Sequence, residues 1–138
     1  KLVAEVLRLD RKRDVALLRL EEVPEDFKIQ ILPVKLEMPE VGDSVYAIGA
    51  PVYTRLQDTV TKGIISGKRF NRKLQHWELQ ADVETYQGNS GGPLLDEAGN
   101  IVGLSVAGYH DRSASLSGLN LFIPIEDALK ELNIKIDG

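Results

Sequence analysis

The sequence predicts an all-β protein in which many short strands are followed by one C-terminal helix. Two observations carry this prediction. The apolar residues come in short runs separated by turn signals rich in Gly, Pro, Asn and Asp, and a helical spacing of apolar residues occurs near the end of the chain. With 138 residues and 43% hydrophobic content, the chain has the size of one domain and enough apolar side chains for a core. We therefore expect a β-barrel or a β-sandwich.

The predicted strands follow one another from the N-terminus to the helix. They cover residues 2–9, 15–20, 30–35, 44–48, 59–68, 77–83, 93–96, 101–107 and 119–124. Alternation is clearest in 59–68, where even-numbered positions fall on one face of the strand and odd-numbered positions on the other. Residues 96–100 predict a tight turn in which Gly99 adopts a positive φ.

The last predicted element is a helix. Pro124 suits its first turn because proline has no N–H group to leave unsatisfied there. Glu126 and Asp127 complement the positive N-terminal end of the helix dipole. Ala128, Leu129 and Leu132 share one face, which predicts that this short helix packs against the strands.

Composition excludes several classes of function. The formal charge of −4 and a pI near 5.2 argue against a nucleic-acid-binding protein, which would present a basic face. A chain without cysteine has no disulfide, no cysteine nucleophile, no iron–sulfur cluster and no thiolate zinc site. No apolar run is long enough to span a membrane. The two histidines lack metal-ligand spacing, so we expect no metal site.

The segment 88–94 reads GNSGGPL and is the sharpest chemical signal in the chain. Glycine tolerates φ > 0 and lets another backbone come close, so such a loop can aim successive N–H groups into one small volume. The hydroxyl of Ser90 would project beside them. Donors placed in this way stabilise the negative charge that develops in acyl transfer, as in an oxyanion hole. The alternative is a glycine-rich turn that carries a surface serine.

Asp14 stands immediately before the strongly apolar predicted strand 15–20. One interpretation is a carboxylate at the edge of a barrel that accepts a hydrogen bond from an imidazole N–H and fixes its tautomer. The other is a residue that merely ends a turn. Asp10 lies in a polar stretch nearby and is interpreted as a turn residue.

Together these segments resemble the trypsin-like (chymotrypsin-fold) serine proteases, and specifically their bacterial HtrA/Deg-like branch. The resemblance covers almost the whole chain, and the order of Asp14 before the GNSGGP segment is highly specific. The matching stretches are 13–20, 42–49, 63–66, 81–94, 99–104 and 118–124.

The resemblance implies a role for each matching residue. Ser90 would be the nucleophile that forms an acyl-enzyme, and Asp14 would orient the catalytic imidazole. The segment Gly88, Asn89 and Ser90 would form the oxyanion hole, with the first and last as N–H donors. Asn89 matches the HtrA-like branch, whereas digestive proteases carry Asp there, so activation by N-terminal cleavage is not expected. Substrate would contact a pocket wall and a strand that pairs with its backbone: Glu84, Thr85, Tyr86, Gln87, Val106, Ala107 and Gly108.

Glu84 departs from the HtrA-like branch, which usually has a small apolar residue at this place. In trypsin-like enzymes the corresponding position lies at the base of the specificity pocket, where a carboxylate would favour Lys or Arg side chains. Alternatively, the side chain of Glu84 points to solvent or pairs with a nearby arginine.

The resemblance also implies two six-stranded antiparallel β-barrels, of which the first is expected to be N-terminally incomplete. Residues 1–40 would be the remainder of the first barrel, 41–124 the second barrel and 125–133 the C-terminal helix. The exposed edge would be covered by oligomerisation or domain exchange. The family further implies polypeptide substrates, no cofactor, homo-oligomeric assembly as a trimer, and a periplasmic or cell-envelope location, with a cytoplasmic one left open.

The catalytic histidine of this family precedes the aspartate, yet none of the residues before Asp14 is histidine. His76 is expected to be a half-exposed structural residue, and His110 lies in a polar, serine-rich loop. Neither matches the family's histidine by order. Three interpretations remain open. The chain is the C-terminal part of a protease domain whose histidine lies upstream, or a non-catalytic relative that binds peptides, or a protease in which His110 is the base.

Overall fold

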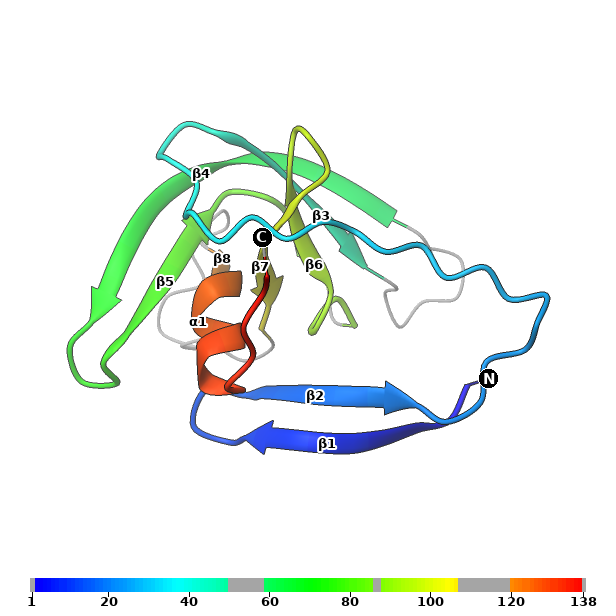
Figure 1. Cartoon of the computed structure of the whole chain (residues 1–138). Helices are drawn as coiled ribbons and strands as arrows, with labels where there is room; N and C mark the ends of the chain where they lie inside the picture. Colours follow the sequence, from blue (N-terminus) through cyan, green and yellow to red (C-terminus); the bar gives the residue numbers. More distant parts are fainter. Residues whose placement is uncertain (1, 50–58, 86–87, 107–119, 138) are drawn as a thin grey trace.

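The computed structural model describes residues 2–49, 59–85, 88–106 and 120–137. Figure 1 shows strands arranged around a barrel and one short helix. The elements are β1 (Ala4–Asp10), β2 (Val15–Leu20), β3 (Ser44–Gly49), β4 (Thr59–Asn71), β5 (His76–Ala81), β6 (Pro93–Asp96), β7 (Ile101–Ser105), β8 (Asn120–Pro124) and α1 (Ile125–Glu131). The predicted all-β fold class with a C-terminal helix is confirmed.

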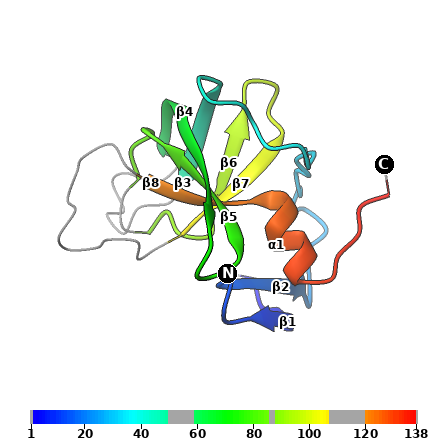
Figure 2. The ribbon, with the colours of Figure 1, turned by 90° about the vertical axis from the view of Figure 1, so that its left-hand side faces the viewer.

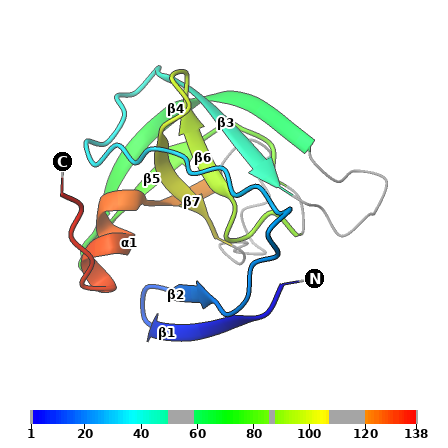
Figure 3. The same ribbon diagram turned by 45° about the vertical axis from the view of Figure 1, so that its right-hand side comes forward.

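Strands β3 to β8 form a closed antiparallel barrel in the order β3-β4-β5-β8-β7-β6 (Figure 3). Alternate side chains along these strands point inward, as the pleat of a strand requires. They form the main core: Val45, Ala47, Ile65, Leu79, Ala81, Val83, Leu94, Val102 and Phe122. Burial of these side chains is the main stabilising contribution to the barrel, and closure satisfies its strand edges.

β1 and β2 form a separate antiparallel hairpin, which lies beside α1 and below the barrel (Figure 2). The start of β2 is anchored in a second apolar cluster with β8 and α1. The buried members of this cluster are Val15, Ile123, Ile125, Ala128 and Leu132. Helix α1 is therefore a common support of the barrel and the hairpin.

The opposite face of the hairpin, here called its outer face, is apolar and exposed. Directly paired residues share a face of a sheet, and the pairs on the outer face include Val6 with Leu18 and Leu9 with Ala16. Leu18 is 56% exposed, and Val6 and Leu9 are exposed to a similar degree. No part of the chain that the structure describes covers this apolar surface.

The predicted strand over residues 30–35 is wrong. The segment forms only an isolated parallel bridge, from Val34 to Ile101 of β7. Pro33 has no N–H group to donate, and Ile31 is 89% exposed, so the segment has neither the pairing nor the buried face of a strand. The other predicted strands are confirmed within the described residues, with ends that shift by a few positions.

The predicted turn at 96–100 is confirmed, and Gly99 has a φ of 83°. The carboxylate of Asp96 accepts hydrogen bonds from Ala98 N, Asn100 N and Asn100 Nδ2, at 3.0, 2.9 and 3.0 Å. Partial burial by itself would raise the pKa of Asp96. The hydrogen bonds from Asn100 and Ala98, together with the charge of Lys35, outweigh burial and hold this pKa below its ordinary value.

Asp96→Asn should lower the stability of the chain at pH 7 by roughly 1 kcal/mol, because the amide carries no charge and its NH2 group cannot accept the bond that Asn100 Nδ2 donates to the carboxylate. The carboxylate stabilises the fold above its unfolded-state pKa, and this stabilisation is lost as the pH falls through the lowered folded-state pKa. The difference in stability between variant and wild type should therefore narrow as the pH falls below 3.8, the ordinary pKa of the group, as measured by urea denaturation. Glu97→Gln, exposed in the same turn, is the control; an equal loss in both variants would contradict the prediction.

Candidate active site

The loop that leads into β6 holds Ser90 at the surface. Gly88 and Gly91 have φ angles of 103° and 82°, in the left-handed region that favours glycine. Two backbone hydrogen bonds tie this serine loop to β7, from Gly91 N to Ser105 O at 2.8 Å and from Ser105 N to Gly92 O at 2.9 Å. The backbone that directly follows the exposed serine is therefore fixed to β7.

Asn89 is the buried member of the serine loop, with 3% of its surface exposed. Its side chain lies so close to the end of β3 that a Cβ atom at Gly49 would clash with it. A Cβ atom at Gly92 would likewise clash with the carbonyl oxygen of Ile48. Glycine at both positions lets the loop pack directly on β3. Gly49 ends one of the stretches that resemble the family, but the sequence pattern alone assigns it no role.

Asn89→Asp should make the stability of the chain dependent on pH. Among the described residues, Asn89 Oδ1 is buried without a hydrogen-bond partner, so a carboxylate there would have its folded-state pKa raised above the unfolded value. Relative to wild type, the variant should lose little stability in acid and about 2 kcal/mol or more as the pH rises through that raised pKa. Denaturation between pH 4 and 8 measures this loss.

Asn133→Asp is the matched control, since it adds the same charge at an exposed position after α1. Its stability should follow that of the wild type across this pH range. A loss of stability in Asn89→Asp that does not depend on pH would contradict the prediction that the environment of Asn89 disfavours a charged carboxylate.

Asp14 lies in the turn that joins β1 to β2. Asp14 is exposed, and its φ of 63° is in the left-handed region. Its neighbours Arg13 and Val15 are both buried. The turn is linked to the serine loop through β7, because Leu104 packs against the cluster that contains Val15 and the adjacent Ser105 bonds to the loop. The hairpin and the barrel thus each carry one half of the candidate site.

The predicted substrate-contacting residues are described only in part. The residues Tyr86, Gln87, Ala107 and Gly108 lie outside the described ranges. Thr85 and Val106 are half-buried, whereas Glu84 is exposed. Thr61 Oγ1 donates a hydrogen bond to the carbonyl oxygen of Glu84 at 2.7 Å. The backbone just before the serine loop is therefore fixed against β4.

His76, the first residue of β5, is buried and not half-exposed as predicted. Its Nε2 lies 3.1 Å from Glu78 Oε1, and Asn71 Nδ2 donates to the same oxygen at 3.3 Å. These contacts give His76 the surroundings of a structural residue. His110 lies outside the described residues. Within the described ranges, no group of three His, Cys, Asp or Glu side chains is placed to hold a metal ion.

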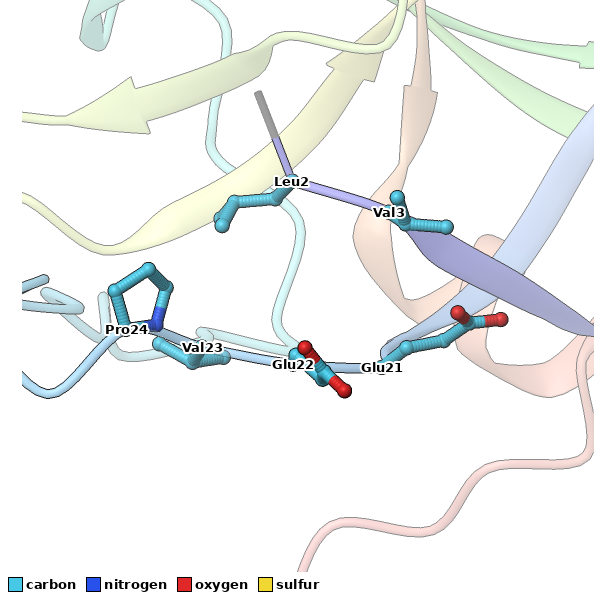
Figure 4. Close-up of a pocket in the computed structure, with 6 residues that line it drawn as sticks. All are labelled: Leu2, Val3, Glu21, Glu22, Val23 and Pro24. Carbon is cyan, nitrogen blue, oxygen red and sulfur yellow. The ribbon is translucent and has the colours of Figure 1, made fainter.

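A pocket at the open end of the hairpin is separate from these residues. It is lined by Leu2, Val3, Glu21, Glu22, Val23 and Pro24 (Figure 4). Among the residues that the structure describes, its lining contains neither serine nor histidine and none of the predicted site residues. The serine loop and the Asp14 turn therefore remain the candidate site.

Comparisons with known proteins identify a family model, related sequences and a related structure. Residues 1–104 match the family model described as a trypsin-like peptidase domain. The chain is 38% identical over 131 residues to Protease Do-like 1, chloroplastic, of Arabidopsis thaliana, with 89% of this chain and 28% of that protein aligned. It is 36% identical over 135 residues to a probable periplasmic serine endoprotease DegP-like of Hahella chejuensis, with 96% and 28% aligned.

A solved structure with the same fold is that of the HtrA-type protease AlgW with decapeptide. It superposes with a TM-score of 0.75 at 30% identity and covers 96% of this chain and 40% of that one. The chain spans 28% of the length of the two curated relatives named above.

Proposed function

Because the chain belongs to the family of trypsin-like peptidases, in its HtrA/Deg-like branch, we propose that it acts as a serine endopeptidase through an acyl-enzyme on Ser90. The observation that carries the proposal is the serine loop. Ser90 is exposed between two glycines in left-handed conformations, and the loop packs against the backbone of a closed barrel. Such a support presents a nucleophile in one fixed position.

In this proposal the hydroxyl of Ser90 attacks the scissile carbonyl carbon while a general base takes its proton. The N–H groups of Gly91 and Gly92 already bond to carbonyl oxygens within the protein. The oxyanion donors are therefore expected to be the N–H groups of Gly88 and Ser90, as the resemblance implies. The base then returns the proton to the leaving amine, and water hydrolyses the ester by the same steps.

Asp14 would hold the imidazole of the base in the tautomer that accepts the serine proton. His76 does not suit the role of base, because it is buried beside Glu78 in the β4–β5 hairpin. We therefore propose that the base is a histidine outside this sequence, on strands that complete a first barrel with residues 1–40. A non-catalytic peptide-binding module and a base at His110 are the alternatives.

The outer face of the hairpin supports this part of the proposal. Val6, Leu9, Leu18 and Leu20 on this face are all exposed. A two-stranded hairpin is marginally stable in water unless further strands or a helix cover its apolar face. The relatives extend well beyond the region aligned with this chain, which leaves room for such strands.

The proposed substrates are polypeptides, bound by β-strand addition along residues 106–108. A preference for basic side chains through Glu84 belongs to the same proposal and is tested by comparing Lys and Leu substrates. A periplasmic or cell-envelope location is proposed from the DegP-like relatives, and a trimer from the family resemblance. Within the described ranges, no helix is both long and apolar enough to cross a membrane.

In the natural polypeptide that contains this sequence, Ser90 should react with a fluorophosphonate probe, and Ser90→Ala should abolish labelling and peptide hydrolysis. Asp14→Asn should lower kcat by about 10³–10⁴, because the base loses its correct tautomer. Mass spectrometry of the labelled peptide identifies the serine. Ser66→Ala, an exposed serine of β4, is the control and should leave both readouts unchanged.

The outcome separates the three interpretations. A natural polypeptide that resists labelling, and that has no further histidine, favours the peptide-binding module. Labelling of the 138-residue chain that His110→Ala abolishes makes His110 the base. Labelling that requires additional strands with a histidine supports the proposal.

Leu18→Thr tests the proposed cover of the outer face. In the 138-residue chain this residue is 56% exposed, so the change should alter stability by less than about 0.5 kcal/mol. In the natural polypeptide the same change should cost about 2 kcal/mol or more, because a leucine buried by the proposed strands loses its packing. Val60→Thr, at 57% exposure in β4, is the matched control and should have a small effect in both. Small effects of Leu18→Thr in both the 138-residue chain and the natural polypeptide would contradict the proposal that further strands cover the outer face.

A further inference from the structure

We propose that Arg13 is a positioning residue: its guanidinium fastens the turn that carries Asp14 to β5 and α1, and so fixes the direction of the Asp14 carboxylate. The inference rests on the proposed function, in which Asp14 orients the catalytic imidazole. Arg13 would contact neither the substrate nor the imidazole and would act through its neighbour.

Arg13 is 7% exposed although it lies in a turn between two strands. Its Nη2 donates to the carbonyl oxygen of Trp77 in β5 at 2.5 Å and to Asp127 Oδ2 in α1 at 3.2 Å. The same oxygen of Asp127 accepts a hydrogen bond from Trp77 N at 3.1 Å. One guanidinium therefore joins the turn, the barrel and the helix.

Asp14 is held in its backbone conformation from both sides. Its φ of 63° is uncommon for a residue other than glycine, and such a conformation persists where the surroundings impose it. On one side the backbone N–H of Arg13 donates to Asp10 Oδ1 at 2.7 Å, which closes the turn. On the other side Val15 is buried against β8 and α1. Because both neighbours are anchored, the backbone of Asp14 cannot rotate independently of them.

The direction of this carboxylate matters for catalysis. A carboxylate that orients an imidazole has to lie within hydrogen-bond reach of its N–H, and a misplacement of about 1 Å can cost about 10²-fold in rate. Both bonds come from Nη2, whose two hydrogens lie in the plane of the guanidinium and point in fixed directions toward a carbonyl and a carboxylate. A lysine ammonium is a point charge with three rotatable donors and does not fix these directions.

Arg8 offers a matched control, because it ties the same hairpin to the same helix at a different place. Its Nη1 donates to the carbonyl oxygens of Leu132 and Asn133, beyond the last turn of α1, at 2.6 and 2.9 Å. It lies within β1 and not in the turn that carries Asp14. Arg8→Gln therefore loosens the attachment of the hairpin but leaves the contacts of Arg13 in place.

The first test measures peptide hydrolysis by the natural polypeptide that contains this sequence. Arg13→Gln should lower kcat by about 10–10²-fold and change KM less than about twofold. The acidic limb of its kcat/KM profile should move to lower pH, since an imidazolium that loses its carboxylate partner has a lower pKa. In an Asp14→Asn background, Arg13→Gln should cause little further loss. Arg8→Gln should leave the acidic limb in place.

The second test needs no activity and uses NMR on the 138-residue chain. The backbone order parameter of Asp14 should be about 0.85 in the wild type and should fall to about 0.6 in Arg13→Gln. Arg8→Gln should leave it high. Asp127→Asn removes the charge of one acceptor of Nη2 and leaves the bond to the Trp77 carbonyl in place, so it should give an intermediate value and serves as the variant if Arg13→Gln does not fold.

The two tests fail in distinguishable ways. A wild-type polypeptide without peptidase activity overturns the proposed function. An Asp14 order parameter that stays at the wild-type value in Arg13→Gln, or an acidic limb that does not move, overturns the role of Arg13.

Discussion

The pairing of β3 with β6 is the contact on which the rest of the structure depends. β3 pairs with β4 along one edge and with β6 along the other, so this pairing closes the barrel. At the same place the side chain of Asn89 packs on Gly49, and Gly92 packs on the backbone of Ile48 in β3. Closure of the barrel and the conformation of the serine loop therefore depend on the same contact between β3 and β6. A change that separates β3 from β6 would open the core and release Ser90 from its support together.

Helix α1 has the corresponding role between the barrel and the hairpin. A helix of 7 residues is too short to be stable through helix propensity alone, so its stability comes from its contacts. Its first turn contacts Arg13 through Asp127, and Arg8 donates hydrogen bonds to the carbonyl oxygens that follow its C-terminal end. Its buried face shares a cluster with β8 and β2. The helix and the hairpin support one another, and the position of Asp14 depends on both.

The sequence pattern predicted the barrel strands and the helix, because an element that buries one face has apolar residues at regular intervals along its sequence. Residues 30–35 are also rich in apolar residues, but Pro33 cannot donate a backbone hydrogen bond and Ile31 is exposed, so the segment does not join a sheet. The glycines around Ser90 predicted positive φ angles, because few other residue types adopt such angles. Neither the burial of Asn89 nor that of Arg13 leaves such a signal. An arginine in a charged turn is ordinarily solvated, and only tertiary contacts with distant segments reverse this.

The distribution of apolar residues on the hairpin supports the proposal that further strands complete a first barrel. A hairpin that only covers α1 needs apolar side chains on its inner face alone, where Val15 and Leu17 lie. This hairpin carries apolar residues on its outer face as well, including Leu18 and Leu20. Apolar residues on both faces are typical of a sheet buried between two layers. A second layer would bury this surface and would also supply the segment from which an imidazole reaches Asp14. The exposed face and the unassigned base therefore have one explanation in the proposed additional strands.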